Sequence, residues 1–214
     1  MPGKELQSRP KRSSTSSDQK REILLSIAAE LFLAQGYAAV SVDEIIQRAG
    51  QSKTNVYSWF GGKSGLFLAT VDKLCAEVLV PLATLNCAGA PLRQGLCEIA
   101  EILLTAIATK RAVALHRLVV AEAVAFPKIA QKWNSDGPER VYQILAHFIE
   151  WHQRAGNLTV EDPMLLARQL YNLLAGDLER RLLLGLTRQL SKKKLIELIT
   201  PSVDMFLNRY EKKI

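Results

Sequence analysis

The stretch from Ser41 to Lys63, which reads SVDEIIQRAGQSKTNVYSWFGGK, constrains the fold of this chain more than any other segment. Ser41 stands three residues before Glu44, the spacing at which a hydroxyl and a carboxylate cap the start of a helix reciprocally. Gly50 follows the apolar residues of that helix, where a left-handed C-terminal cap belongs. Ser52 can cap a second helix, which two consecutive glycines end. Two brief helices joined by a tight turn are therefore predicted.

The second of these helices is too short to be stable alone, because helix nucleation costs more than so few hydrogen bonds return. Val56 and Phe60 point inward, and the other faces carry hydroxyl, amide, aromatic and lysine side chains. A short exposed helix of this kind, braced by a first helix across a turn, is typical of a helix-turn-helix that enters the major groove of DNA. The alternative is a surface helical hairpin without a special role.

A longer amphipathic helix is predicted before this stretch, from Asp18 to a glycine stop at Gly36. Three helices over residues 18–60 would share a core too small to be stable alone, so the helix that begins near Lys63 is needed as well. The expected core consists of Ile27, Leu31, Phe32, Val40, Ile45, Ile46, Val56 and Phe60.

Residues 1–17 mix basic residues, prolines and serines, a composition that cannot bury enough surface to become ordered. We expect a disordered basic tail. It is either a solvated terminus without a role or an arm that follows DNA phosphates or enters the minor groove, and the sequence leaves both open. The net charge of +7 favours a polyanionic partner, although charge alone often reflects only solubility.

The sequence contains no pattern that indicates an enzyme. His147 and His152 are five residues apart, which does not place two metal ligands on one helix face, and GxSxG, Walker A and GxGxxG motifs are absent. No cofactor and no metal are expected. Cys75, Cys87 and Cys97 lack CxxC spacing and are interpreted as reduced, buried thiols of a cytoplasmic protein. No membrane partner is expected, because the longest uncharged run, residues 78–92, is too short to span a bilayer.

The order LFLAQGY, SVDEIIQRAG and SKTNVYSWFGGKSGLF, over about residues 20–68, resembles the N-terminal domain of the TetR/AcrR family of bacterial transcriptional regulators. The resemblance implies an all-helical homodimer that releases operator DNA when a small molecule binds a C-terminal domain. It also implies DNA-binding residues of two kinds: base contacts by Lys53, Thr54 and Tyr57, and phosphate contacts by Ser41, Asn55, Trp59 and Lys63.

Two positions depart from the family pattern. Trp59 stands where members often have histidine, and its indole either donates to a phosphate or packs inward. Gln51 stands where the turn usually carries an aliphatic residue. Facing the groove, it would add an adenine contact; buried, it would cost stability, so it is left out of the DNA-binding set.

The segment from Leu115 to Trp151 resembles the C-terminal domain of the AefR-like branch of this family, on the run RLVVAEA, the FP that follows it and the helix restart at a Gly-Pro pair. The resemblance implies a helical effector-binding domain. Its many apolar residues predict a cavity for a mainly hydrophobic small molecule with few polar contacts, for which we nominate Cys97, His116, Trp133 and Tyr142.

Two apolar stripes near the end of the chain predict a pair of helices that could pack with the same pair of a second subunit. The residues assigned to this dimer interface are Leu170, Leu174, Leu178, Ile199, Val203 and Phe206. The alternative is that the stripes face the chain's own core.

We therefore expect an all-α protein of about nine helices, with a disordered basic tail over residues 1–17, a helix-turn-helix DNA-binding domain over 18–66, and an effector-binding and dimerisation domain over 67–214. The predicted function is a ligand-responsive regulator, with repression preferred. It would bind a pseudo-palindromic operator as a homodimer in the cytoplasm of a bacterium and associate with the nucleoid when bound to DNA. The alternatives are a sequence-nonspecific DNA-binding protein without an effector and a helical small-molecule-binding protein.

Overall fold

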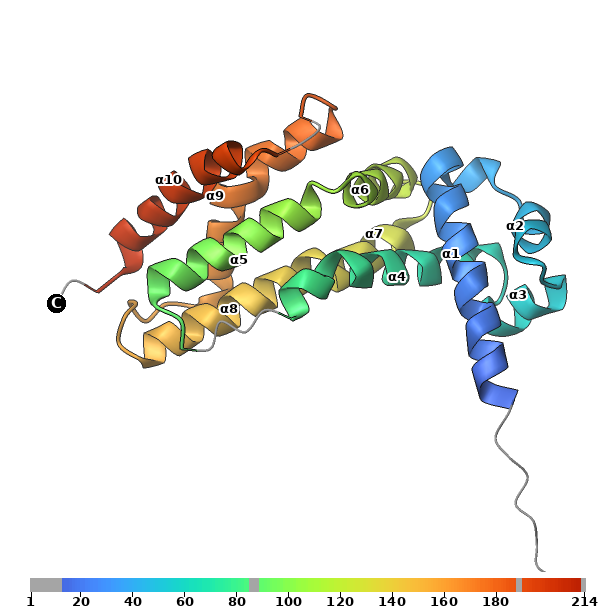
Figure 1. Ribbon diagram of the computed structural model, residues 1–214, viewed down its shortest axis with the longest axis horizontal. Helices are drawn as coiled ribbons and strands as arrows, with labels where there is room; N and C mark the ends of the chain where they lie inside the picture. The colour runs from blue at the N-terminus through green and yellow to red at the C-terminus, as the bar shows by residue number, and fades with distance from the viewer. Residues whose placement is uncertain (1–12, 85–88, 188–189, 213–214) are drawn as a thin grey trace, which may run out of the picture. The chain divides into compact units, whose positions relative to one another are not determined.

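The computed structural model describes residues 13–84, 89–187 and 190–212. These residues form ten α-helices, where about nine were expected (Figure 1). The helices are α1 (Ser13–Ala39), α2 (Val42–Ala49), α3 (Lys53–Phe60), α4 (Lys63–Ala83), α5 (Leu92–Ile107), α6 (Lys110–Glu122), α7 (Pro127–Asp136), α8 (Pro138–Arg154), α9 (Pro163–Leu183) and α10 (Lys192–Tyr210). The all-α prediction is confirmed.

The chain divides into two compact units, Met1–Thr70 and Val71–Ile214. The boundary falls inside α4, a few residues beyond the position expected from the sequence. Because α4 belongs to both units, its apolar pattern does not change at the point where one core ends and the next begins. Local sequence signals therefore do not mark the boundary.

The first helix begins at Ser13, five residues before the expected start at Asp18. The apolar pattern reports where packing begins, whereas helical hydrogen bonding can continue beyond the packed face. At the other end, Gly36 has φ 81° and ψ 169°, so the helix is interrupted at the predicted glycine stop. Residues 1–12 of the expected tail lie outside the described residues.

The caps predicted for the two short helices are present. Ser41 Oγ accepts a hydrogen bond from the Glu44 backbone N–H at 3.0 Å, and Ser52 Oγ accepts one from the Asn55 N–H at 3.3 Å. Gly50 ends α2 with φ 61°, in the left-handed region. The reciprocal half of the predicted capping box differs, because the Glu44 carboxylate accepts from Gln35 at 3.3 Å and pairs with Arg48 at 2.9 Å.

The core of the N-terminal unit contains most of the residues that the sequence predicted, but the buried face of α1 differs from the expected one. Five of the eight expected residues are buried, and Ile27, Ile46 and Phe60 are only half-buried. On α1 the buried face includes Leu24 and Ala28. The start of α4 adds Phe67, whose ring lies 4.9 Å from the ring of Phe32.

The first helix is apolar enough to need an explanation. Within the helical segment Ser17–Ala39, an 18-residue window has a mean hydropathy of 1.3, and by length and composition alone this segment could cross a membrane. Its side chains Leu24, Ala28 and Phe32 are fully buried within the N-terminal unit. Packing in the core buries 33% of that window and so accounts for part of its hydropathy.

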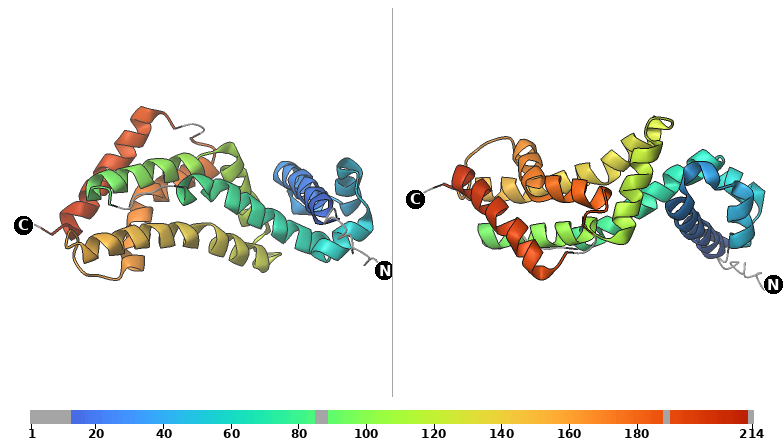
Figure 2. Two further views of the ribbon diagram at one scale, coloured as in Figure 1. Left: turned by 60° about the horizontal axis from the view of Figure 1, so that its bottom comes forward. Right: turned by 90° about the horizontal axis from the view of Figure 1, so that it is seen from above.

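The C-terminal unit is a layered bundle of helices. The helix α8 packs on α9, while α10 packs on both α5 and α9, and α6 packs on α7 (Figure 2). Its core is continuous through α4, α5, α8, α9 and α10 and includes Leu103, Leu145, Leu170 and Phe206. This arrangement brings residues of α4, α5, α6, α7, α8 and α9 around one cavity.

Candidate DNA-binding surface and ligand cavity

The helix α3 has one buried side and one exposed side. Val56 is fully buried, whereas Lys53, Thr54 and Tyr57 are exposed, and Tyr57 keeps 55% of its surface in solvent. With more than half of its surface in solvent, Tyr57 contributes little to the core. The three residues assigned to base contacts thus lie on the solvent-facing side of the second short helix.

Lys53 is paired within the protein. Its ammonium lies 3.0 Å from the Asp43 carboxylate, which stands at the start of α2. The hydrogen bond from Lys53 and the charge of Asp43 raise the pKa of the lysine above its ordinary value. Both side chains are largely exposed, so the pair adds little to stability, but it fixes where the lysine points.

Gln51, whose orientation the sequence left open, is half-buried in the turn. Its Oε1 accepts a hydrogen bond from Asn55 Nδ2 at 3.0 Å. The amide therefore replaces the usual aliphatic contact with a polar bridge from the turn to α3. This bridge positions Asn55, and the sequence alone did not predict a contact between the two side chains.

Lys63 lies at the start of α4 and is held against the end of α1. Its ammonium is 4.3 Å from the centre of the Tyr37 ring, a cation–π distance, and it donates a hydrogen bond to the Ala38 carbonyl oxygen at 3.4 Å. Trp59 is half-buried and packs edge-to-face on Phe60, with 6.4 Å between ring centres. Tyr37 was not assigned a role from the sequence, and it orients the lysine.

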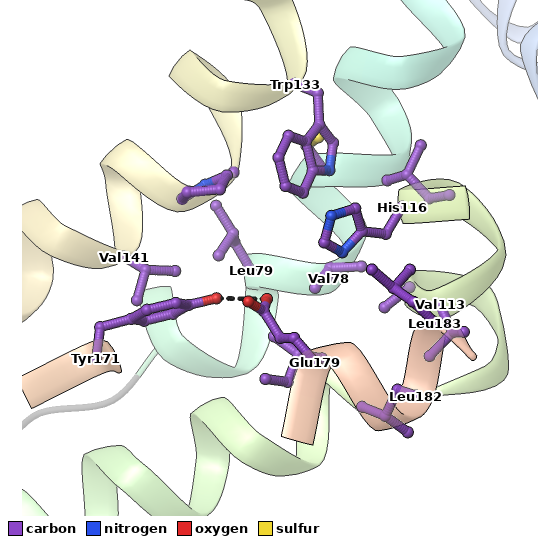
Figure 3. A pocket seen from close by; sticks show the side chains of 16 residues that line it. Val78, Leu79, Val113, His116, Trp133, Val141, Tyr171, Glu179, Leu182 and Leu183 are labelled. Atoms are coloured by element: carbon purple, nitrogen blue, oxygen red, sulfur yellow. Dashed lines mark hydrogen bonds between the residues drawn. The ribbon is translucent and has the colours of Figure 1, made fainter. Parts of the chain in front are cut away.

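The C-terminal unit contains a cavity of about 610 Å³, counting the part open to solvent (Figure 3). Its lining comes from six helices, α4 to α9, and from Gly137 between α7 and α8: Cys75, Val78, Leu79, Ile107, Ala112, Val113, Leu115, His116, Trp133, Gly137, Pro138, Val141, Tyr171, Glu179, Leu182 and Leu183. Most of this lining is apolar, as in pockets that hold small organic molecules.

Two of the four nominated ligand contacts line this cavity. The rings of His116 and Trp133 stack, with 4.5 Å between centres and 30° between planes. Cys97 and Tyr142 do not belong to the lining. Cys97 is half-buried on α5, and the Tyr142 ring packs at right angles against Tyr171, so these two residues lie outside the lining.

The polar lining that the sequence reading missed lies on α9 and α4. Tyr171 donates a hydrogen bond to Glu179 Oε1 at 2.7 Å, as Figure 3 shows. Burial and the nearby Glu179 raise the pKa of Tyr171, so its hydroxyl stays protonated. Burial also raises the pKa of the Cys75 thiol to about 12. The signal for Glu179 was present, because an acidic residue there interrupts an apolar stripe.

The six residues assigned to a dimer interface all lie in the chain's own core. Leu170, Leu174, Leu178, Ile199, Val203 and Phe206 each keep 6% or less of their surface exposed. Their assignment to the interface needs correction, because side chains that are buried within their own chain cannot contact a partner. The exposed apolar residues of α9 and α10 are Leu165, Leu173, Ile196 and Met205.

The capped pair α2 and α3, braced by α1 and the start of α4, defines a helix-turn-helix protein. Residues 24–70 match the model of the bacterial regulatory proteins of the tetR family, and residues 94–212 match the C-terminal domain of AefR-like transcriptional repressors. The second match spans more than half of the chain. The chain belongs to the TetR family of transcriptional regulators, which are DNA-binding proteins and not enzymes, and the resemblance read from the sequence is confirmed.

Solved structures similar to the whole chain carry the same architecture. A TetR-family regulator of Mesorhizobium loti has a TM-score of 0.83 and 27% identity, with 92% of this chain and 98% of that one covered. A protein named flavonoid-responsive regulator FrrA has a TM-score of 0.81 and 29% identity, with 92% and 100% covered.

Curated relatives match a shorter part of the chain. The transcriptional activator FasR of Mycolicibacterium smegmatis is 42% identical over 71 residues, 31% of this chain and 32% of that protein. The transcriptional repressor BdcR of Escherichia coli K12 is 32% identical over 78 residues, 36% and 40% respectively. The chain therefore matches about a third of the length of these relatives, and one of them activates while the other represses.

Proposed function

We propose that this chain is a ligand-responsive repressor that binds a pseudo-palindromic operator as a homodimer in the bacterial cytoplasm and leaves it when a small molecule enters the cavity of the C-terminal unit. The observation that carries the proposal is α3, a short helix capped at its start by Ser52 and with its polar side exposed. The AefR-like match favours repression, and the name of FrrA favours a small-molecule signal.

Base recognition is assigned to the exposed side of α3. Lys53 can donate to O6 or N7 of guanine, while the methyl group of Thr54 and the ring of Tyr57 suit the methyl group of thymine. The phosphate backbone is assigned to Ser41, Asn55, Trp59 and Lys63. Ser41 Oγ accepts from a backbone N–H and so keeps its own O–H free to donate to a phosphate oxygen.

The test is binding to DNA from the genomic neighbourhood of the coding sequence, measured by fluorescence anisotropy against unrelated duplex. We expect the preferred site to bind at least about 1,000-fold more tightly than unrelated DNA. Equal affinity for all sequences would support the nonspecific DNA-binding alternative. Failure to bind any duplex would support the small-molecule-binding alternative.

Lys63→Ala is expected to weaken binding to operator and unrelated DNA by similar factors. A phosphate contact carries no sequence information, so the loss should be uniform, and the slope of log K against log salt should fall by about one unit. Anisotropy titrations at several salt concentrations measure both. Lys128→Ala, an equal charge change on α7, is the control, and a loss confined to the operator would instead place Lys63 at a base.

The homodimer is assigned to the exposed apolar residues of α9 and α10. Leu173 and Met205 lie together along a surface groove between these helices, with 41% and 61% of their surfaces exposed. A two-fold axis beside this groove would bury them against their copies, as in a four-helix interface.

Leu173→Asp combined with Met205→Asp is expected to convert the dimer to a monomer. Each carboxylate would be buried unpaired in the interface, which is costly, and a monomer loses one of two half-sites. Analytical ultracentrifugation measures the state. Val124→Asp is the matched control, since Val124 is 92% exposed on another segment, and a double variant that stays dimeric would place the interface elsewhere.

A further inference from the structure

We propose that the cavity of the C-terminal unit binds a flat aromatic molecule that donates a hydrogen bond to Glu179, either a phenol or a protonated amine, and discriminates against organic anions. This inference rests on the proposed function and adds to it the chemical class of the effector. Three features of the cavity support it: the composition of the lining, the open acceptor positions of the Glu179 carboxylate, and the stacked rings of His116 and Trp133.

Glu179 is the charged residue among the lining side chains. In the described part of the chain, Tyr171 is the donor that hydrogen-bonds to it, at 2.7 Å. A carboxylate has about four acceptor positions, so a single neutral donor leaves most of them open. An acceptor facing an apolar cavity is stabilised strongly by a donor that arrives with a ligand, because otherwise it depends on the few waters that fit there.

The remaining polar lining adds no positive charge. Burial lowers the pKa of His116, an effect that the nearby Glu179 partly opposes, so the imidazole is mostly neutral at pH 7. Cys75 is a protonated thiol. A carboxylate ligand would therefore meet a negative charge without a compensating cation, which is the unfavourable case for a poorly solvated ion.

Arg117 is adjacent to His116 in the chain but does not change this balance. Its guanidinium donates to the carbonyl oxygens of Leu182 and Leu183, each at 2.9 Å, at the C-terminal end of α9. The cation is thus used at a helix end, where it complements the dipole. It is not among the residues that line the cavity.

The stacked rings in the lining of the cavity favour a flat aromatic ligand. His116 and Trp133 form a stacked pair on one side of the cavity, and Figure 3 shows Glu179 and Tyr171 approaching from α9 near the same space. An aromatic ligand gains by stacking on such a pair, and its substituent can then reach the carboxylate. The apolar residues around them provide the rest of the contact.

The test uses four molecules with one ring system: 2-naphthol, 2-(aminomethyl)naphthalene, 2-naphthoic acid and 2-methylnaphthalene. Isothermal titration calorimetry at pH 7 measures their binding to the full chain without DNA. We expect the phenol or the ammonium compound, or both, to bind at least about ten-fold more tightly than the acid and the hydrocarbon. The two donors separate a neutral from a cationic effector.

Glu179→Gln should remove this preference while keeping the size of the side chain and a carbonyl that can accept from Tyr171. Trp133→Leu should instead weaken all four molecules by similar factors. Glu150→Gln, which removes a carboxylate paired with Arg154 on the exposed side of α8, is the control and should change nothing. Thermal melts confirm that each variant is folded.

Tighter binding of the acid, an unchanged preference in Glu179→Gln, or no binding of any of the four would overturn the assigned ligand class. Release of operator DNA is measured separately with the compounds that bind. Donor-selective binding without release would leave the ligand class standing and contradict the proposed regulation, so the two failures are distinguishable.

Discussion

Gly65→Ala is expected to destabilise the N-terminal unit and to abolish operator binding. A β-carbon added at Gly65 would lie 1.7 Å from the carbonyl oxygen of Phe60 and 2.8 Å from its carbonyl carbon. Both atoms belong to the backbone at the end of α3, so no side-chain rotation can relieve the overlap. The junction between α3 and α4 must shift, and overpacking of this kind costs about 1–3 kcal/mol or more.

The loss of DNA binding is expected because Gly65 lies beside the junction of α3 and α4. α3 carries the residues assigned to bases, and Lys63 stands two residues before the substituted glycine, so a moved junction displaces both sets together. Circular dichroism melts and anisotropy with operator duplex measure the two effects. Gly176→Ala is the control in the melts, because nothing lies within 4 Å of a β-carbon there and alanine favours a helix. An unchanged melt and affinity in Gly65→Ala would show that the junction yields easily.

The features that the sequence predicted well depend on neighbouring residues. Ser41, Gly50 and Ser52 cap their helices because a hydroxyl three residues before a backbone N–H, or a glycine after the last apolar turn, acts locally. These signals can be recognised without knowledge of the fold. They were sufficient to place the helix pair and the exposed side of α3.

Features that depend on distant residues were missed or misassigned. Leu170 and Leu173 are both apolar residues of α9, yet one is buried in the chain and the other is 41% exposed. Periodicity finds an apolar side of a helix but cannot say which neighbour covers it. Cys97 and Tyr142 lie outside the cavity lining for the same reason, whereas tertiary packing places Cys75, on α4, in it.

The Asp43–Lys53 pair also depends on residues that are distant in the sequence. The two residues are ten apart, on different helices, and the turn between them brings ammonium and carboxylate within 3.0 Å. To reach guanine, the lysine must leave or share this carboxylate. Asp43 therefore orients Lys53 and, if α3 binds DNA as proposed, would place a negative charge near the phosphates.

Lys53→Ala is expected to lower operator affinity about 10- to 100-fold, the range for one lost base contact, with a much smaller loss on scrambled DNA. Asp43→Asn should raise affinity for both duplexes by a few-fold, more at low salt, because it removes a negative charge and frees the lysine. Anisotropy with the two single variants and the double variant measures the coupling between the residues. Folding should be unaffected, since both side chains are exposed. Equal losses on both duplexes in Lys53→Ala would make Lys53 a phosphate contact, and additive effects in the double variant would mean that Asp43 does not orient it.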